Sequence, residues 1–516
     1  MTTTRRAAIR LEQLSFTYAG ASRPLFQNIQ AHVPSGWTAI VGENGAGKTT
    51  LMQLIAGELR PSAGKIHQDP EDLSVAICPQ RVEQQDSLAE LAANSWGGNA
   101  MRIKSLLGLD DAWEQWMRWE TLSPGERKRW QIAGALIAAP EVLLLDEPTN
   151  HIDRHTRALL AQALEQYEGI GMVVSHDRAF LDDLCAQTIW LEGDGSLDVY
   201  AGGYSAAREV RHANRERLRA ERDALSSRRR ALSRQLDQEQ RDLERADKSI
   251  SARSRMKSRK DSDARSMAAK ERAKKAAASH SQRASATRSE LDRAEQRLAN
   301  APILKELGRS ICVDWEPCPK PRLATLVIDA LRAGEKTLYS ELSLTWDREM
   351  RIWLRGPNGA GKTTLLEEMM RHLHVPEDRV LYLPQTIPPA DVRAMLSRLD
   401  AATPEDKGRW LNILAALGTP PDRILAREQD ILSPGEARKL LLAEGLAGNV
   451  WGLVLDEPTN HLDLPSIERL QHALLDYPGA LLLITHDDHL GHACADEAWT
   501  LGERIEREPL DPPEIL

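Results

Sequence analysis

The chain has 516 residues, 67 lysines and arginines, 76 aspartates and glutamates, and a formal net charge of −9. This length allows two or more domains with cores of their own, and the acidity excludes indiscriminate nucleic-acid binding by the whole surface. Five scattered cysteines lack metal-ligand spacing, and the amino terminus lacks the apolar run of a signal peptide, so we expect reduced thiols and a cytoplasmic protein. The most apolar segment, residues 133–145, is too short to span a bilayer, so no membrane-spanning segment is expected.

A phosphate-binding loop follows the first predicted strands. Residues 9–34 alternate apolar and polar side chains between turn residues, which predicts antiparallel strands. A short apolar strand, residues 38–41, then leads into Gly42-Glu-Asn-Gly-Ala-Gly-Lys-Thr-Thr50 and a helical pattern. This order of strand, glycine-rich loop and helix is typical of a P-loop, whose N–H groups hold phosphates. Lys48 is expected to reach the β- and γ-phosphates, and the Thr49 hydroxyl is expected to bind Mg²⁺.

Further motifs of the first half complete a recognisable order. They are Pro79-Gln80, Leu122-Ser-Pro-Gly-Glu126, Val142-Leu-Leu-Leu-Asp-Glu-Pro-Thr-Asn-His-Ile-Asp153 and Val173-Val-Ser-His176. The apolar run before Asp146 predicts a buried parallel strand, which places Asp146 and Glu147 at the strand end where α/β sheets bind ligands. An acid there can hold Mg²⁺ and its neighbour can polarise water. An isolated Asp-Glu pair is more often a solvated strand end, but the surrounding motifs favour the chemical interpretation.

The same motifs recur in the second half in the same order. They are Gly356-Pro-Asn-Gly-Ala-Gly-Lys-Thr-Thr364, Pro384-Gln385, Leu432-Ser-Pro-Gly-Glu436, Val454-Leu-Asp-Glu-Pro-Thr-Asn-His-Leu-Asp463 and Ile484-Thr-His486. Three of the repeated residues, a serine, a glutamate and a histidine, are each 310 positions from their first-half counterparts. The sequence therefore predicts two copies of one fold, residues 1–204 and 301–516, joined by residues 205–300.

These motifs resemble those of ATP-binding-cassette (ABC) ATPases, and Asp-Glu-Pro-Thr-Asn-His followed by Ile-Asp or Leu-Asp resembles the ABC-F group. The resemblance covers nearly the whole chain. It implies an α/β fold with two P-loop ABC nucleotide-binding domains, each with a RecA-like core, an antiparallel β subdomain and a helical subdomain. An antiparallel helical hairpin would join them. It also implies an enzyme that binds and hydrolyses ATP with Mg²⁺.

By the same resemblance, the phosphates would be held by Gly42, Asn44, Gly45, Gly47, Lys48, Thr49 and Thr50, and by Gly356, Asn358, Gly359, Gly361, Lys362, Thr363 and Thr364. The Mg²⁺ ligands would be Thr49, Gln80 and Asp146 in the first half, and Thr363, Gln385 and Asp456 in the second. The catalytic residues would be Glu147, His176, Glu457 and His486. Each nucleotide would also meet the signature segment of the opposite half: Ser433, Gly435 and Glu436 facing Lys48, and Ser123, Gly125 and Glu126 facing Lys362.

Two departures from the family pattern bear on these sites. Pro124 and Pro434 replace the more usual glycine of the signature, which removes one N–H donor from each half. Tyr18 resembles the aromatic residue that stacks on adenine, whereas ungapped alignment from the second P-loop places Arg332 there. A guanidinium can lie over a base or point to solvent, and the sequence leaves both open. We expect the two sites to differ in nucleotide affinity.

The joining segment is basic and helical. Residues 205–300 hold 27 lysines and arginines against 15 aspartates and glutamates, a net charge of +12, so the remaining chain sums to −21. Heptads of leucine and alanine at 218, 225 and 232 and at 277, 284, 291 and 298 predict two antiparallel helices. Pairing Leu218 with Leu291 places the turn near Ser254-Arg255 and ends the first helix at about Asp247. The predicted tip carries Arg253, Arg255, Lys257, Arg259 and Lys260.

These cations suit contacts with the phosphates of a structured RNA, although a charge run is more often only a solvated face. In ABC-F proteins the linker reaches from the tRNA exit site of the ribosome toward the peptidyl-transferase centre. The resemblance therefore implies binding to ribosomal RNA and tRNA, and a role in translation or in protection from antibiotics. Neither interval between the glutamine and signature motifs holds a long helical insertion, as in the compact antibiotic-resistance branch. Pairing of the two halves within one chain implies a monomer.

Two other classes remain as alternatives. A soluble ATPase subunit of an ABC transporter would carry the same nucleotide motifs, but it has no need of a basic hairpin. A DNA-handling ABC protein would be expected to carry zinc-binding cysteine pairs or a far longer coiled coil, and the sequence has neither.

Overall fold

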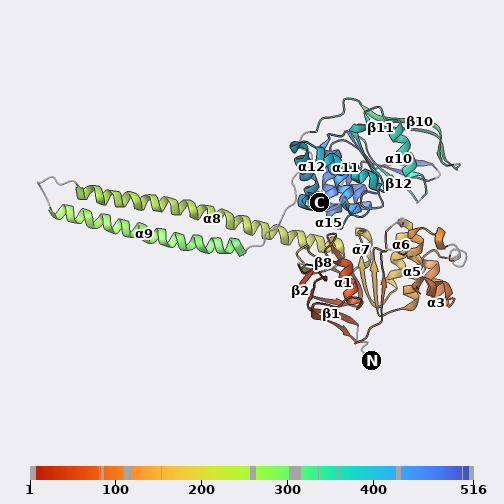
Figure 1. The fold of residues 1–516 in the computed structure, drawn as a ribbon, viewed down its shortest axis with the longest axis horizontal. Helices are drawn as coiled ribbons and strands as arrows, with labels where there is room; N and C mark the ends of the chain where they lie inside the picture. Colours follow the sequence, from red (N-terminus) through yellow and green to blue (C-terminus); the bar gives the residue numbers. More distant parts are fainter. Residues whose placement is uncertain are drawn as a thin grey trace. The chain divides into compact units, whose positions relative to one another are not determined.

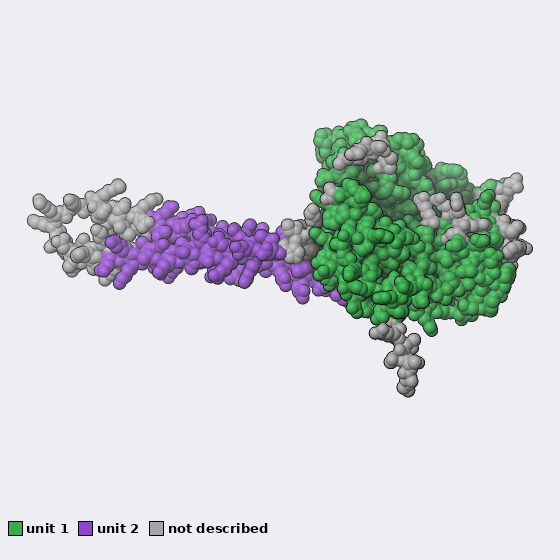
Figure 2. Space-filling model, turned by 60° about the horizontal axis from the view of Figure 1, so that its bottom comes forward, with its two compact units in different colours: residues 1–207, 307–516 green, residues 208–306 purple. Residues whose placement is uncertain are grey.

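The computed structural model describes residues 7–21, 23–80, 82, 87–109, 116, 119–150, 152, 154–255, 263–300, 315–334, 336–357, 359–425, 432–502 and 504–510. The chain divides into two compact units, one of residues 1–207 and 307–516 and the other of residues 208–306 (Figure 2). Among the described residues, none of the helices combines the length and the apolar character that crossing a membrane requires.

Two six-stranded sheets of the same strand order form the centre of the first unit. The first sheet has the order β5-β6-β7-β3-β8-β9, and the second has the order β13-β14-β15-β12-β16-β17. In each sheet the last strand is antiparallel to its neighbour and the others are parallel. The first set is β3 (Gly36–Gly42), β5 (Val75–Cys78), β6 (Val142–Asp146), β7 (Ile170–Val174), β8 (Gln187–Leu191) and β9 (Leu197–Ala201). The second is β12 (Arg351–Arg355), β13 (Val380–Leu383), β14 (Gly452–Asp456), β15 (Ala480–Ile484), β16 (Glu497–Leu501) and β17 (Ile505–Pro509).

The predicted buried strand before Asp146 is confirmed. All five residues of β6 are buried, and β6 pairs in parallel with β5 and β7. A parallel strand with apolar groups on both faces requires cover on both sides, which the helices of each half supply (Figure 1). The carboxyl ends of β6 and β14 therefore present their acidic residues at the edge of each sheet where ligands bind.

Smaller antiparallel sheets accompany the two large ones. In the first half, β1 (Ala8–Phe16), β2 (Phe26–Pro34) and β4 (Ala63–Asp69) form a sheet of order β2-β1-β4, which confirms the antiparallel strands predicted there. In the second half, β10 (Arg322–Ala333) and β11 (Lys336–Asp347) form a two-stranded sheet among the described residues. A long loop joins β1 to β2, whereas a tight turn joins β10 to β11, and this difference alters one of the nucleotide sites.

The helices of the two halves also correspond. The first half contains α1 (Lys48–Ile55), α2 (Ser87–Asn94), α3 (Gly98–Leu106), α5 (Pro124–Ala138), α6 (Arg154–Glu165) and α7 (Arg178–Leu184). The second contains α10 (Lys362–Arg371), α11 (Pro389–Ala401), α12 (Pro404–Ala416), α13 (Pro421–Leu425), α14 (Pro434–Ala447), α15 (Leu464–Asp476) and α16 (Asp488–Cys494). Within each half, one helix begins at the P-loop lysine and another at the signature proline, so both motifs lie at helix N-termini.

The second unit consists of two long helices, α8 (Tyr204–Arg255), whose first residues belong to the other unit, and α9 (Asp263–Asn300) (Figure 1). The residues at the predicted heptad positions are buried or half-buried, as expected for two helices packed along one stripe. Arg228 pairs with Glu290 at 3.9 Å, and the Gln235 amide contacts the Thr287 hydroxyl at 3.4 Å. These contacts run in opposite directions along the two helices, which confirms the antiparallel arrangement.

The predicted axial register of this hairpin is wrong. Pairing Leu218 with Leu291 would set Leu232 opposite Ala277, but the Gln235 contact places this level of α8 near Thr287. Helix α8 continues to Arg255, well past Asp247, so Arg255 ends a helix instead of forming a turn. A heptad stripe repeats along its length, so the pattern alone permits several registers. Arg253 lies on α8, the side chains of Arg253 and Arg255 lie outside the described part, and Lys257, Arg259 and Lys260 lie outside the described residues.

Candidate ATP-binding sites

The two P-loops have backbone conformations that require glycine. Gly45 and Gly47 have φ of +85° and +98°, and Gly359 and Gly361 have φ of +79° and +91°. A Cβ atom at Gly47 would lie 2.6 Å from the Phe26 ring, and one at Gly361 would lie 2.5 Å from Leu338 Cδ1. Left-handed conformations next to close packing leave no room for a side chain. The amides of such a loop form an anion cradle at the start of a helix.

Both P-loop lysines lie across their own loops. Lys48 Nζ donates to the carbonyl oxygens of Gly42 at 2.9 Å and Glu43 at 3.1 Å. Lys362 Nζ makes the equivalent bonds to Gly356 at 2.7 Å and Pro357 at 3.2 Å. Burial lowers the pKa of Lys48, although neighbouring carboxylates oppose the shift. A cation at this position is available to an anionic ligand seated on the loop amides.

A threonine and an aspartate, distant in sequence, meet beside each P-loop. The Thr49 hydroxyl donates to Asp146 Oδ2 at 2.8 Å, and the Thr363 hydroxyl donates to Asp456 Oδ2 at the same distance. Burial raises the pKa of both aspartates, and the threonine bond works against that shift. A hydroxyl oxygen next to a carboxylate oxygen is the hard-oxygen donor set that Mg²⁺ takes.

The glutamates that follow strands β6 and β14 are buried, and each contacts a histidine. Glu147 Oε1 lies 2.9 Å from His176 Nε2, and Glu457 Oε1 lies 3.4 Å from His486 Nε2. Both glutamates have left-handed backbones, with φ of +48° and +49°, which is a strained conformation for a residue with a Cβ. Burial, and then the charge of Asp456, raise the pKa of Glu457 to about 8.

A buried oxygen at the first of these sites has no protein donor. Among the described residues, Glu147 Oε2 has no hydrogen-bond partner. An uncompensated carboxylate oxygen is costly inside a protein, so this atom indicates a place where a water or ligand group binds. Together with the glycine cradle, the lysine and the threonine–aspartate pair, it makes the residues fit a nucleotide phosphate with its divalent cation.

The signature serines and glutamates cap their own helices. The Ser123 N–H donates to Glu126 Oε2 at 2.8 Å, and the Glu126 N–H donates back to Ser123 Oγ at 3.2 Å, a capping box at the start of α5. Ser433 and Glu436 form the same box on α14. The prolines that follow the serines occupy the first helical turn, where a backbone N–H has no intrahelical acceptor, so proline is favourable there. Contact of Glu126 or Glu436 with nucleotide stays a prediction.

The second half packs directly on the first P-loop. The Asn44 N–H donates to Asp463 Oδ2 at 2.6 Å, and its side-chain amide donates to the His461 carbonyl at 3.1 Å. Arg469 pairs with Glu43 at 3.0 Å. A Cβ atom at Gly435 would lie 3.8 Å from the Asn44 amide nitrogen. The structure therefore brings Gly435 of the second half close to the P-loop of the first, and contact of its signature segment with a nucleotide stays a prediction.

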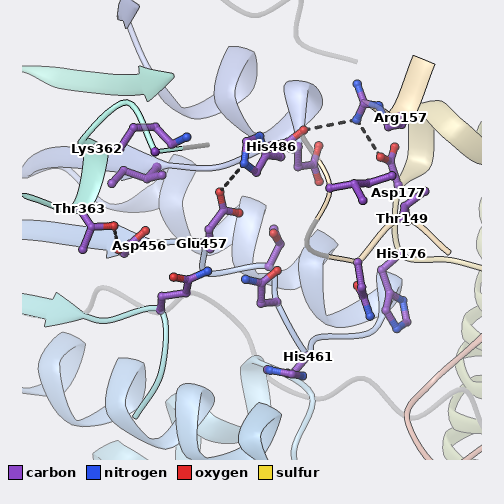
Figure 3. A pocket seen from close by; sticks show the side chains of 18 of the residues that line it. Thr149, Arg157, His176, Asp177, Lys362, Thr363, Asp456, Glu457, His461 and His486 are labelled. Atoms are coloured by element: carbon purple, nitrogen blue, oxygen red, sulfur yellow. Dashed lines mark hydrogen bonds and ion pairs between the residues drawn. The ribbon is translucent and has the colours of Figure 1, made fainter. Parts of the chain in front are cut away.

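An open cavity of about 490 Å³ marks the second P-loop (Figure 3). Its walls come from both halves: Lys362, Thr363, Gln385, Asp456, Glu457 and His486 from the second, and Thr149, Asn150, Arg157, His176 and Asp177 from the first. Ser123 is not among the described residues that line it, so the predicted meeting of Ser123 with this site stays a prediction. Gln385 faces the cavity, whereas Gln80 is exposed, and Asn358 lies outside the described residues.

Comparison with known proteins agrees with this geometry. A family model described as ABC transporter matches residues 26–150 and again residues 339–460. The tylosin resistance ATP-binding protein TlrC of Streptomyces fradiae is 30% identical over 524 residues, covering 88% of this chain and 90% of TlrC. The chain belongs to the ABC-F family of ATPases. The ribosome protection protein VmlR of Bacillus subtilis is 29% identical over 512 residues, 96% of this chain and 88% of VmlR.

A solved structure shares the fold of this ABC-F protein. The RNase-L Inhibitor structure matches over 96% of this chain and 90% of its own length, with a TM-score of 0.60 and 19% sequence identity. At this identity the likeness is one of fold.

The ABC-F chain has an aromatic residue at its first site but not at the equivalent place in the second. In β1–β2 Phe16 pairs with Phe26, and in β10–β11 Leu331 pairs with Tyr339. Leu25 and Leu338, which precede those partners, both pack on a P-loop glycine, so the two hairpins correspond in this register.

In this register the counterpart of Tyr18 is Ala333, one residue from the Arg332 that the ungapped alignment gives. The hairpin of the second half is two residues shorter between its paired positions, and the stretch from there to the P-loop lysine is one residue longer, which leaves a net shift of one residue. Arg332 is exposed, whereas the Tyr18 hydroxyl bonds with Thr50 Oγ1 at 2.7 Å, and its ring packs edge-on against Phe16. Tyr18 is thus held beside the first P-loop.

We expect the first site to bind adenine nucleotides more tightly than the second. Stacking on an aromatic ring contributes roughly 1–3 kcal/mol per base, or about 5- to 150-fold in Kd. Calorimetry on Lys362→Ala, which retains the first site, and on Lys48→Ala, which retains the second, measures this difference. Adding Tyr18→Ala to Lys362→Ala should remove most of the advantage, and equal affinities for the two lysine variants would contradict the expectation.

Two buried cations escaped the sequence analysis. Lys128 Nζ donates to the carbonyl oxygens of Cys78 and Asp146, each at 3.1 Å, and Arg438 donates to the Glu457 carbonyl at 3.1 Å. Both also bond to the backbone of the adjoining glutamine motif, at Pro79 and Gln385. They occupy the same place in the two signature helices, so each ties that helix to the catalytic strand end. A cation five positions after each signature serine was the available signal.

Proposed function

We propose that this ABC-F ATPase binds the ribosome in its ATP-bound state, contacts ribosomal RNA and tRNA through the basic hairpin, and leaves after hydrolysis. One observation carries the proposal: a relative named as a ribosome protection protein aligns with 96% of the chain, including both nucleotide sites and the hairpin between them. The hairpin's net charge of +12 suits a phosphate-rich surface. The transporter alternative would leave that charge without a role.

In this proposal each half holds one ATP on its P-loop. The loop amides and Lys48 or Lys362 bind the phosphates. Thr49 with Asp146, and Thr363 with Asp456, hold Mg²⁺, helped by Gln80 and Gln385. Mg²⁺ supplies charge neutralisation to the phosphates when bound. Glu147 and Glu457 orient and deprotonate water, since each is buried next to a nucleotide loop. His176 and His486 contact the γ-phosphate and hold these glutamates through their Nε2 atoms.

The signature segments close each site from the opposite half. Gly435 lies close to Asn44 of the first P-loop, which supports this arrangement at that site. Ser123 and Gly125 would take the same part at the second site when ATP draws the halves together. Losing the γ-phosphate removes acceptors from this clamp, so hydrolysis switches the halves from closed to open. Because both halves lie in one chain, a monomer can form both sites. A ribosome-binding protein of this kind would act in the cytoplasm, where the ribosomes are.

On the ribosome, we place the chain at the tRNA exit site with the hairpin directed toward the peptidyl-transferase centre. Relatives named for ribosome protection and for tylosin resistance support a role in protecting translation from antibiotics. The cations from Arg253 to Lys260 would meet RNA phosphates there, since the segment has no aromatic residue for base stacking.

Co-sedimentation with ribosomes tests the proposal. The variant Glu147→Gln, Glu457→Gln should pellet with ribosomes in the presence of ATP, because blocked hydrolysis prolongs the bound state. Lys48→Ala, Lys362→Ala is the matched control, since it carries two substitutions at the same sites but loses ATP binding, and it should stay in the supernatant. Finding the glutamine variant free, with ATP bound, would overturn ribosome binding.

A further inference from the structure

Arg157 lies at the meeting point of the two halves and belongs to none of the nucleotide motifs. It is in the first turn of α6, a helix of the first half, and it lines the cavity at the second P-loop. Its side chain is 13% exposed. A long charged side chain held this far from water has to be paired, and its partners lie in both halves.

The Arg157 guanidinium joins two segments that each carry one of the histidines expected to contact the γ-phosphate, His176 or His486 (Figure 3). These two residues are called the switch histidines below. One nitrogen lies 2.7 Å from Oδ2 of Asp177, the residue after His176. The same nitrogen donates to the His486 carbonyl oxygen at 3.4 Å, and the other donates to Oδ2 of Asp488 at 3.1 Å. Burial works against the charge, yet Asp177 and Asp488 outweigh it and raise the pKa of Arg157. The guanidinium therefore stays protonated and can hold both segments at once.

This bridge exists once and not twice. The residue 310 positions after Arg157 is Ile467, which is 1% exposed and also lines the cavity. The counterpart of Asp488 is Arg178, which donates to Gln471 at 2.8 Å. The second half thus lacks the arginine, and the first half lacks the acid in place of Asp488, that a symmetric bridge would need.

We propose that Arg157 is a positioning residue that couples the two ATP sites by tying the switch-histidine segment of each half to that of the other. The proposal rests on the roles proposed above for His176 and His486. Each histidine contacts its own catalytic glutamate, so movement of one segment reaches the other glutamate through one side chain. Coupling of this kind requires an element with contacts in both sites, and the guanidinium has them.

The test compares rates of ATP hydrolysis by the full-length chain without ribosomes. A coupling factor is defined as the parent rate divided by the summed rates of its Glu147→Gln and Glu457→Gln variants. When Arg157 is present, blocking hydrolysis at one site should also slow hydrolysis at the other. We therefore expect a coupling factor of about ten. In the Arg157→Ile background, which copies the residue of the second half, the two single-site rates should add up to the parent rate and the factor should fall to about one.

Asp488→Asn provides a second route to the same result, because it removes the acidic partner of the bridge in the second half while leaving Arg157 and nearly the same volume in place. Arg469→Leu is the matched control: it removes another guanidinium that crosses between the halves, at Glu43, but touches neither histidine segment, so the factor should stay near ten. Thermal melting checks that each variant folds. A factor unchanged in both Arg157→Ile and Asp488→Asn overturns the proposal, and so does a factor of one in the parent. Either result leaves the co-sedimentation test of ribosome binding standing.

Discussion

Replacing Glu147 and Glu457 together with glutamine should slow ATP hydrolysis by about 10²- to 10⁴-fold, the range that a positioned general base contributes. Both carboxylates are buried beside a P-loop and hold a histidine. Glutamine keeps the shape of the side chain but cannot take a proton from water. Nucleotide affinity should stay within about twofold, because the loop amides and lysines that bind phosphate are unchanged.

Phosphate release at saturating ATP, with calorimetry for affinity, measures the two quantities separately. Glu444→Gln is a suitable control. This glutamate of α14 pairs with Arg398 of α11 and takes no part in either site. A double variant that retained a third of the wild-type rate would contradict the assignment of both glutamates.

Removing the charge of the hairpin tip should weaken ribosome binding by about 100-fold and lower the slope of log affinity against log salt by about four, because each lost phosphate contact returns its counterions. The variant replaces Arg253, Arg255, Lys257, Arg259 and Lys260 with alanine. ATP hydrolysis in the absence of ribosomes should be unchanged. Binding measured by co-sedimentation across a salt series gives both the affinity and the slope.

The hairpin offers a control of equal charge. Arg217, Arg229, Arg230, Arg234 and Arg241 are exposed on α8 away from the tip, and their replacement with alanine changes the net charge by the same amount. If the two variants lose affinity equally, net charge alone explains binding and the tip has no special part.

Much of the nucleotide-site architecture was predictable because its motifs restrict the backbone. The glycines before Lys48 can adopt the left-handed conformations that lead into a helix, and α1 begins at that lysine. The uninterrupted apolar run ending at Asp146 allows little besides a buried parallel strand. The repeated motif order predicted one fold twice, and the two large sheets share one strand order.

Contacts between the halves were not predictable, because they join residues without periodicity or motif. Arg157 and Asp488 are 331 positions apart, and neither has a counterpart of its own type in the other half. The aromatic difference depended on the length of one turn, which an ungapped alignment cannot register. The register of the hairpin was mispredicted because alanine and leucine stripes fit one another in several registers.

The hairpin also has little core of its own. Among its described residues from 208 onward, the buried ones are Leu232, Thr287 and Ala294, and half-buried arginines share the stripe with the leucines. With so little apolar area removed from water, the packing of α8 on α9 contributes far less free energy than the sheets of the other unit. Its backbone amides are therefore expected to exchange with solvent through local opening while the sheets stay closed. Binding to a rigid partner would suppress this local opening, so complex formation would include an entropic cost.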